Sequence, residues 1–313
     1  MSLRGNRLWG VAARGMAMGA ADVVPGVSGG TIAFITGIYQ ELLDSISRVG
    51  PHAITVLRRH GPLVAWQYIN GSFLLALFAG ILISIVSLAR LIGYLLDTYP
   101  VTLWGFFFGL VLASVIPVLR RVPRWNTGAF FYLLLGVLVA IGVSELRPAQ
   151  IPATPLILFL SGAVAICAMI LPGISGSFIL LMIGIYPHVL AAVHELQVMK
   201  LLYFAAGALT GLMLFSRLLS WLMHHYLART LAFLGGILLG SLNIIWPWKL
   251  ASEPVAGEHL PPLLSNTSPW TYAEVSGESN YLLAALIAAA VAALIVLAVD
   301  FYGHRQGGAS EGR

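Results

Sequence analysis

Charged side chains are scarce in this chain of 313 residues, since Asp, Glu, Lys and Arg together make up only 9% of it. An ordinary soluble domain carries roughly a quarter charged residues, so this composition excludes a typical globular protein. Hydrophobic residues account for 59%, and the mean hydropathy is +0.90. Several charge-poor runs reach the roughly 20 residues that a spanning helix needs. We therefore predict an all-α polytopic membrane protein.

Cysteine is almost absent, because Cys167 is the only one in the sequence. A single cysteine excludes an intramolecular disulfide framework and a metal site built from several thiolates. His194 and Glu195 begin a pattern typical of zinc proteases, but Val198 stands where the second histidine is needed. We therefore expect no metal site, no other cofactor and no catalytic residue.

The most informative stretch occurs twice: residues 22–31 read DVVPGVSGGT and residues 169–178 read MILPGISGSF. Proline removes a backbone donor and glycine adopts dihedral angles that other residues avoid, so a helix must stop and restart at each copy. Between apolar runs this pattern predicts a broken helix, and broken helices in membranes are built around ligands. The recurring residues are Pro25, Gly26, Ser28 and Gly29 in the first copy and Pro172, Gly173, Ser175 and Gly176 in the second.

The similarity continues beyond these two breaks and predicts a duplicated chain. Residues 37–39, Gly-Ile-Tyr, recur at 184–186 with the same spacing from the break. Arginine is rare in membrane helices, so a matched arginine pair is stronger evidence of duplication than matched glycines. The two breaks are 147 positions apart, and a second set of residues matches at a constant offset of 127 positions. These residues are Gly80, Arg90, Gly109 and Ser114, which match Gly207, Arg217, Gly236 and Ser241.

We predict that both repeats follow one plan, a re-entrant broken-helix hairpin and then about three transmembrane helices. Charges do not separate a re-entrant hairpin from two extra spanning helices; we favour the hairpin because a Ser/Gly motif at the surface would have no function. The first repeat covers 1–148, with its hairpin at 8–48 and helices at about 73–96, 101–119 and 128–144. The second covers 149–313, with its hairpin at 155–193 and helices at about 201–223, 230–246 and 281–299.

Basic residues fall mainly on one side of this topology, which places both termini in the cytoplasm by the positive-inside rule. The other side receives the acidic loop 248–279. Each half crosses the membrane an odd number of times, so the two repeats must be inverted relative to each other. The basic pI of about 9.5 thus reflects membrane orientation and not a nucleic-acid partner. The residues on the predicted cytoplasmic side are Arg4, Arg7, Arg58, Arg59, Arg120, Arg121, Arg124, Arg229, Arg305 and Arg313.

The two breaks have the chemistry of an anion or phosphate site. A helix that restarts there has unpaired backbone N–H groups and a positive dipole end, glycine allows close approach, and hydroxyls add donors. Alternatively, the glycines only allow close helix packing. The predicted phosphate-binding residues of the breaks are Gly26, Ser28, Gly29, Gly30, Thr31, Gly173, Ser175, Gly176 and Ser177.

Three charged residues accompany the breaks. Arg90 and Arg217 lie well inside predicted spanning helices, where a buried arginine costs at least about 2.5–3.5 kcal/mol and needs a partner or a function. We expect them to form a phosphate clamp near each gate, although both could instead reach an interface with their long stems. Asp22 precedes the first break and repels a bound anion when ionised, so its protonation would couple transport to protons. An interfacial helix-end carboxylate is the alternative for Asp22.

With these two motifs in a duplicated polytopic chain, the sequence resembles the PopT-type family of bacterial undecaprenyl-phosphate transporters. The resemblance covers nearly the whole chain, but residues 177–178, Ser-Phe, replace Gly-Thr of the first copy, so the two half-sites are not equal. It implies a re-entrant-helix fold in the inner membrane that returns this carrier lipid of cell-wall polymers from the outer to the inner leaflet. It also implies a phosphate head group between the halves and proton-motive force as the driver.

Two other classes of function fit parts of the sequence. Residues 26–30 match the G-x-S-x-G pattern of serine hydrolases, and intramembrane serine proteases share similar motifs, but no histidine lies inside a late spanning helix. A channel or exchanger for a small inorganic anion is the stronger alternative, because helix N-termini rich in Ser and Gly bind halide or phosphate equally well. The sequence leaves open whether the protein forms a homo-oligomer.

Overall fold

The computed structural model describes residues 2–24, 27–146, 151–251 and 264–308. Helices make up nearly all of these residues, as predicted for an all-α membrane protein. The strands found in the described ranges form one short antiparallel pair, β1 (Lys249–Ala251) with β2 (Leu264–Asn266), in which Leu250 lies opposite Ser265.

The first half of the chain begins with a long helix, continues with four short helices and ends with three long ones. Its helices are α1 (Ser2–Asp22), α2 (Gly29–Ile35), α3 (Tyr39–Ser47), α4 (Pro51–His60), α5 (Pro62–Tyr68), α6 (Gly71–Thr98), α7 (Pro100–Arg120) and α8 (Thr127–Ser144). The second half repeats much of this order. Its helices are α9 (Pro155–Ile170), α10 (Gly176–Met182), α11 (Tyr186–His194), α12 (Val198–His225), α13 (Leu227–Ser241), α14 (Pro269–Ser276) and α15 (Leu282–Gly308).

Local sequence explains several of these helix starts. Proline occupies the first turn of α7 and α9, where its missing N–H costs nothing. Asn126 caps α8, because its side chain accepts a hydrogen bond from the Ala129 N–H at 2.8 Å. Thr154 caps α9 in the same way through the N–H of Ile157.

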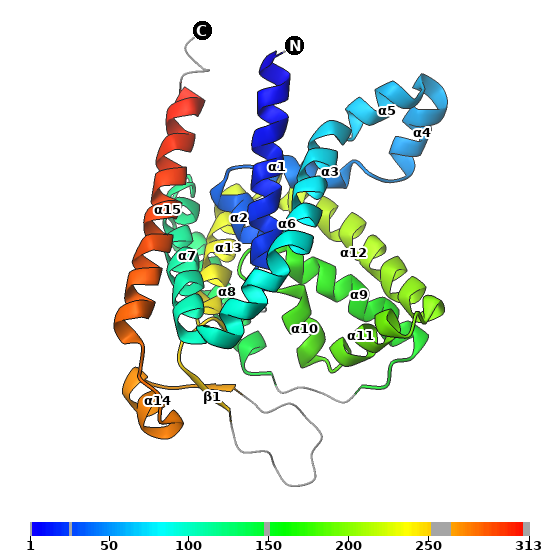
Figure 1. The fold of residues 1–313 in the computed structure, drawn as a ribbon. Helices are drawn as coiled ribbons and strands as arrows, with labels where there is room; N and C mark the ends of the chain where they lie inside the picture. The colour runs from blue at the N-terminus through cyan, green and yellow to red at the C-terminus, as the bar shows by residue number, and fades with distance from the viewer. Residues whose placement is uncertain (1, 25–26, 147–150, 252–263, 309–313) are drawn as a thin grey trace.

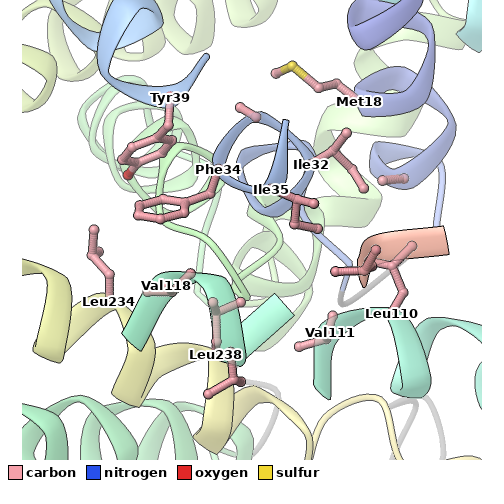
Figure 2. Close-up of a cluster of buried hydrophobic side chains, with 14 of the residues drawn as sticks. Met18, Ile32, Phe34, Ile35, Tyr39, Leu110, Val111, Val118, Leu234 and Leu238 are labelled. Atoms are coloured by element: carbon pink, nitrogen blue, oxygen red, sulfur yellow. The ribbon is translucent and has the colours of Figure 1, made fainter. Parts of the chain in front are cut away.

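Five helices of the described chain are long and apolar enough to cross a bilayer: α6, α7, α8, α12 and α15. The helix predicted at 230–246 is α13, which ends already at Ser241 and is shorter than those five. It is nonetheless central, because Leu234, Ile237 and Leu238 are fully buried. Figure 2 shows how Leu234 and Leu238 face Val118 of α7 and the side chains of α2.

The second arm of each predicted hairpin is two helices and not one. α2 and α3 are separated at Gly37, and α10 and α11 at Gly184, where φ is +74° and +73°. Only glycine adopts such angles without strain, so the repeated Gly-Ile-Tyr sequence is a second interruption in each half. The axes of α10 and α11 differ in direction by 108°.

The long helices pack in pairs through glycines, and the same contact occurs in both halves. A β-carbon on Gly80 of α6 would lie 2.1 Å from the Ala12 carbonyl oxygen of α1, so no larger residue fits. On α12, a β-carbon on Gly207 would lie 1.8 Å from the Phe159 carbonyl oxygen of α9. Gly207 follows Gly80 by 127 positions and Phe159 follows Ala12 by 147 positions, and these are the two offsets that relate the repeated sequences. The packing of α1 on α6 thus corresponds to that of α9 on α12.

The remaining long helices also pair across the two halves. α8 packs on α13, where a β-carbon on Gly136 would lie 2.2 Å from the Phe233 carbonyl oxygen. α7 packs on α15, where one on Gly109 would lie 2.2 Å from the Ala289 carbonyl oxygen. The predicted inversion of the two repeats stays a prediction.

The two ends of the molecule differ in what they carry. α1 begins and α15 ends at the same end, where α4 and α5 also lie, while α14 and β1 lie at the opposite end (Figure 1). The first of these ends is the one that the charges assign to the cytoplasm. Two parts of that charge pattern, Arg313 and residues 252–263 of the acidic loop, lie outside the described residues.

Candidate functional site

The first break joins α1 to α2 and is closed by hydrogen bonds of its own. Ser28 is the N-cap of α2, and its Oγ accepts a hydrogen bond from the Gly30 N–H at 3.1 Å. The Asp22 carboxylate accepts one from the Gly29 N–H at 2.7 Å. A β-carbon at position 29 would lie 2.5 Å from the other Asp22 carboxylate oxygen, so a larger residue there would displace this carboxylate. The carboxyl group of Asp22 therefore lies at the start of α2 and takes up one of its backbone N–H groups.

The second break joins α9 to α10 and is more open. Ser175 is the N-cap of α10, but its Oγ pairs with the Ser177 Oγ at 2.8 Å and not with a backbone N–H. Within the described ranges, the N–H groups of Ser175, Gly176 and Ser177 have no hydrogen-bond acceptor. Gly173 has φ of +92°, a conformation that favours glycine.

The two breaks lie against each other. Ser28 Oγ is 3.1 Å from both the Met169 and the Leu171 carbonyl oxygens, to which it can donate its single proton. Thr31 Oγ1 accepts a hydrogen bond from the Gly173 N–H at 3.0 Å. Both of these first-break side chains have no exposed surface. The structure thus brings together two motifs that are more than 140 residues apart in sequence, at a buried position.

Tyr39 is part of this junction, and the sequence analysis gave it no role. Its hydroxyl donates to the Ile170 carbonyl oxygen, the last residue of α9, at 3.2 Å. Its ring contacts that of Phe34 with centroids 5.0 Å apart (Figure 2). The repeated Gly-Ile-Tyr sequence was the available signal. Its counterpart Tyr186 is 39% exposed, so the two tyrosines have different surroundings.

The predicted arginine clamp is not assembled at the breaks in this conformation. Arg217 is exposed on α12, and its guanidinium donates to the carbonyl oxygens of Ser47, the last residue of α3, and of Val49 at 3.1 and 3.2 Å. Arg90 is exposed on α6. Gly26, together with Pro25, lies outside the described residues.

Two further arginines were not considered as site residues. Arg121, half-buried after α7, donates to the Phe34 carbonyl oxygen at 3.3 Å and lies over the Phe34 ring at 5.6 Å. It therefore fixes the C-terminal end of α2, the helix that starts at the first break. Arg14 lies half-buried within α1, about two turns before Asp22. Its position inside the apolar stretch before the first break is the signal in the sequence that marks it.

Two acidic residues of α3, Glu41 and Asp44, tie this helix to three other elements. Glu41 accepts hydrogen bonds from Arg7 of α1 at 3.0 Å and from Asn70, next to α6, at 2.9 Å. Asp44 accepts one from Ser220 of α12 at 2.6 Å. The segment after the first break is therefore held on several sides by polar contacts.

Comparison with known proteins agrees with the resemblance. A family model described as undecaprenyl phosphate translocase-like matches residues 18–259, a range that contains both breaks. A protein of Vibrio cholerae serotype O1, named polyprenyl-phosphate transporter, is 46% identical over 295 residues, which cover 93% of this chain and 96% of the relative. A Staphylococcus aureus protein of the same name is 32% identical over 253 residues, which cover 75% and 84%. No solved structure matches the chain.

The matched family and both relatives are named for transport and not for catalysis, which agrees with the expectation that the chain is not an enzyme. The identity to the Vibrio cholerae protein extends over almost the full length of both chains. The matched range also includes the helices that hold the breaks together. This chain belongs to the undecaprenyl phosphate translocase-like family of bacterial membrane transporters.

Proposed function

We propose that this protein carries polyprenyl phosphate, of the undecaprenyl class, from the outer to the inner leaflet of the bacterial inner membrane. The named cargo of its relatives supports this assignment. Such a cargo needs a polar cradle for its phosphate and an apolar surface for its tail. The described chain offers a buried polar junction between the two breaks and long apolar helices around it.

The observation that carries the proposal is the contact between Ser28 and Thr31 of the first break and residues 169–173 at the second. Each hydroxyl joins the two halves at the point where both helices are interrupted. A phosphate between the breaks would bind N–H and hydroxyl donors from both halves, without a charged side chain. The remaining predicted ligands lie at or next to the two helix starts: Gly29 and Gly30 begin α2, Gly176 and Ser177 begin α10, and Gly173 and Ser175 precede α10.

In this proposal Asp22 is the proton-coupled residue. Its carboxylate bonds the Gly29 N–H, so it occupies a donor that a phosphate would need. Two negative charges cannot share that donor at low cost, and protonation of Asp22 weakens its hold on the N–H. Proton binding would then favour phosphate binding, which links the cargo to the proton gradient.

Arg90 and Arg217 belong to the proposal as gate residues. The guanidinium of Arg217 now binds two backbone carbonyls at the end of α3. To reach a phosphate it would have to exchange these contacts, as happens when a gate opens. The duplicated contacts of Gly80 and Gly207 support the two-repeat plan, in which inverted halves expose the junction to each leaflet in turn.

Binding by the purified protein tests the cargo. We expect native mass spectrometry to detect retained polyprenyl phosphate but not the polyprenol that lacks the phosphate. Ser28→Ala combined with Thr31→Ala should reduce this binding about tenfold or more. Ser216→Ala is the matched control, because Ser216 is fully buried on α12 and its hydroxyl bonds only its own helix at Met213.

Equal binding of the phosphate and the alcohol would contradict the proposed cargo. The stronger alternative, a channel or exchanger for a small inorganic anion, predicts phosphate or chloride flux through proteoliposomes that added polyprenyl phosphate does not inhibit. Our proposal predicts no such flux. The lipid-transporter and anion-channel hypotheses therefore predict opposite results in one vesicle preparation.

A further inference from the structure

The helices α4 and α5 form a hairpin that the proposed transport site does not use. They connect α3 to α6 and project from the helix bundle at the end where α1 begins (Figure 1). None of the ten residues of α4 is buried, and α5 buries only Ala65. The hairpin thus contributes almost nothing to the core.

α4 is amphipathic, and its apolar face is not covered by any other part of the described chain. Ile54 and Leu57 lie three positions apart, so they share one face of the helix, and they are 51% and 46% exposed. Thr55 and Arg59 share another face, and both are exposed. Successive residues turn by about 100°, so Leu57 and Thr55 point in directions that differ by about 160°. An apolar face is therefore uncovered beside a polar one.

α5 continues the uncovered apolar surface. Leu63 is 77% exposed and Val64 44%. Trp66 is 43% exposed, and its Nε1–H donates to the Ser72 Oγ at the start of α6 at 3.1 Å. Its ring also lies close to Gly71, the first residue of α6, where a β-carbon would be 2.4 Å from the ring. These contacts fix the hairpin to α6, so its apolar surface is held in one position.

Charge indicates what covers this surface. Arg58, Arg59 and His60 form the last turn of α4, and no acidic residue occurs between residues 51 and 70. Interfacial helices combine an apolar face with a basic polar face, and they place the first at the acyl boundary and the second among anionic head groups. Each Lys or Arg near an anionic surface contributes about 1 kcal/mol. Tryptophan is enriched at the same depth of the bilayer.

We infer that α4 and α5 form a membrane-surface anchor on the leaflet at this end of the molecule. Ile54, Leu57, Leu63 and Trp66 lie at the acyl boundary, and Arg58 and Arg59 bind anionic lipid head groups. This inference does not rest on the phosphate site. It gives the segment after the first break a fixed depth at the membrane surface, because only Arg48, Val49 and Gly50 separate α3 from α4.

A matched pair of cysteine variants tests the anchor. Leu57→Cys and Thr55→Cys, each made with Cys167→Ala, replace residues that are both exposed in the protein alone and keep both arginines. In nanodiscs that hold one copy of the protein and contain anionic lipid, a water-soluble thiol reagent should label Leu57→Cys about tenfold more slowly than Thr55→Cys. Neutral lipid, or Arg58→Gln with Arg59→Gln, should reduce that ratio several-fold.

Equal labelling rates in the single-copy nanodiscs would overturn the inference. Slow labelling of Leu57→Cys only in nanodiscs with two copies would overturn it as well, since a second protein chain would then be the partner. Because both cysteines replace exposed side chains, a normal elution profile on gel filtration is expected. Loss of lipid-phosphate binding by Ser28 variants leaves these rates unchanged, so the anchor and the cargo can fail separately.

Discussion

The two breaks have similar sequences but different hydrogen bonding. At the first, the N–H groups of Gly29 and Gly30 are bonded to Asp22 and Ser28. At the second, the corresponding N–H groups of Gly176 and Ser177 have no acceptor within the described residues. A duplicated motif can therefore supply one half-site that is closed by its own side chains and one that is open. Under the proposed function, we expect the open second break to receive the phosphate first and the first break to join it once Asp22 releases the Gly29 N–H.

The helices that follow the breaks also differ in their polar contacts, and again the first half is the more restrained one. α3 is held by Arg7 through Glu41 and by Ser220 through Asp44. Its counterpart α11 has no such ties in the described chain: His188 contacts the carbonyl of Gly184 at its own helix start. The first half thus provides the restrained side of the junction, and the second half provides the more accessible one.

Forcing the breaks apart should have the largest effect. Gly30→Val places a β-carbon only 2.7 Å from the Ile170 carbonyl oxygen, so the two halves cannot keep their contact. We expect loss of transport and a fall of about 1–3 kcal/mol in the free energy of unfolding in detergent. Gly142→Val is the control, because nothing lies within 4 Å of a β-carbon at that exposed position of α8. Equal behaviour of the two variants would contradict the close contact.

Removing one acceptor should have a smaller effect. Thr31→Val keeps the shape of the side chain but leaves the Gly173 N–H without the Thr31 hydroxyl. A buried donor without a partner costs about 1–3 kcal/mol, so the unfolding midpoint in denaturant should fall and phosphate-lipid binding should weaken. Thr210→Val, at an exposed site on α12 where the hydroxyl bonds its own helix at Ala206, should change neither quantity.

Neutralising the internal carboxylate should change the pH dependence of binding more than stability. Asp22→Asn keeps an oxygen that can accept from Gly29 but carries no negative charge at any pH. In the wild type, binding should weaken as pH rises, because the ionised carboxylate repels the phosphate; in the variant this weakening should be lost, and only the titration of the phosphate itself remains. Asp97→Asn, exposed on α6, should keep the wild-type profile. An Asp22→Asn variant with the wild-type pH profile would remove Asp22 from the coupling mechanism.

The two tyrosines give the smallest and most direct comparison. Tyr39→Phe removes the hydroxyl that bonds Ile170, which should lower the free energy of unfolding by about 0.5–1.5 kcal/mol. Tyr186→Phe should have no measurable effect, since its side chain is partly exposed and has no such bond in the described chain. Denaturant unfolding measures both. Equal losses would mean that the two halves are more alike than the structure indicates.

Much of the fold could be predicted from the sequence, because it depends on composition and on helix interruption. Apolar runs located the long helices, and the Pro-Gly-Ser clusters located both breaks. The sequence did not predict that the second arm of each hairpin is two helices, since one glycine inside an apolar run is usually tolerated in a helix. Only the positive φ of Gly37 and Gly184 shows that the chain turns there.

The partners of the polar side chains depended on three-dimensional contacts that no local pattern records. Glu41 and Asp44 fit a solvated helix end by sequence, yet they join α3 to its neighbours. Arg217 fitted a phosphate clamp, but in this conformation it binds carbonyls 168 and 170 positions away in sequence. Long, flexible side chains can reach several alternative partners, so sequence limits their role without determining it.

The glycine contacts at Gly80 and Gly207 restrict how the molecule can change shape. Backbones that touch without an intervening side chain cannot slide past each other, since the next residue on either side would collide. Each of these two helix pairs must therefore move as one rigid unit. The pairs are α1 with α6 and α9 with α12. If the protein transports lipid as proposed, the opening motion has to occur between these two pairs, and it would break the hydrogen bonds of the Ser28 and Thr31 hydroxyls.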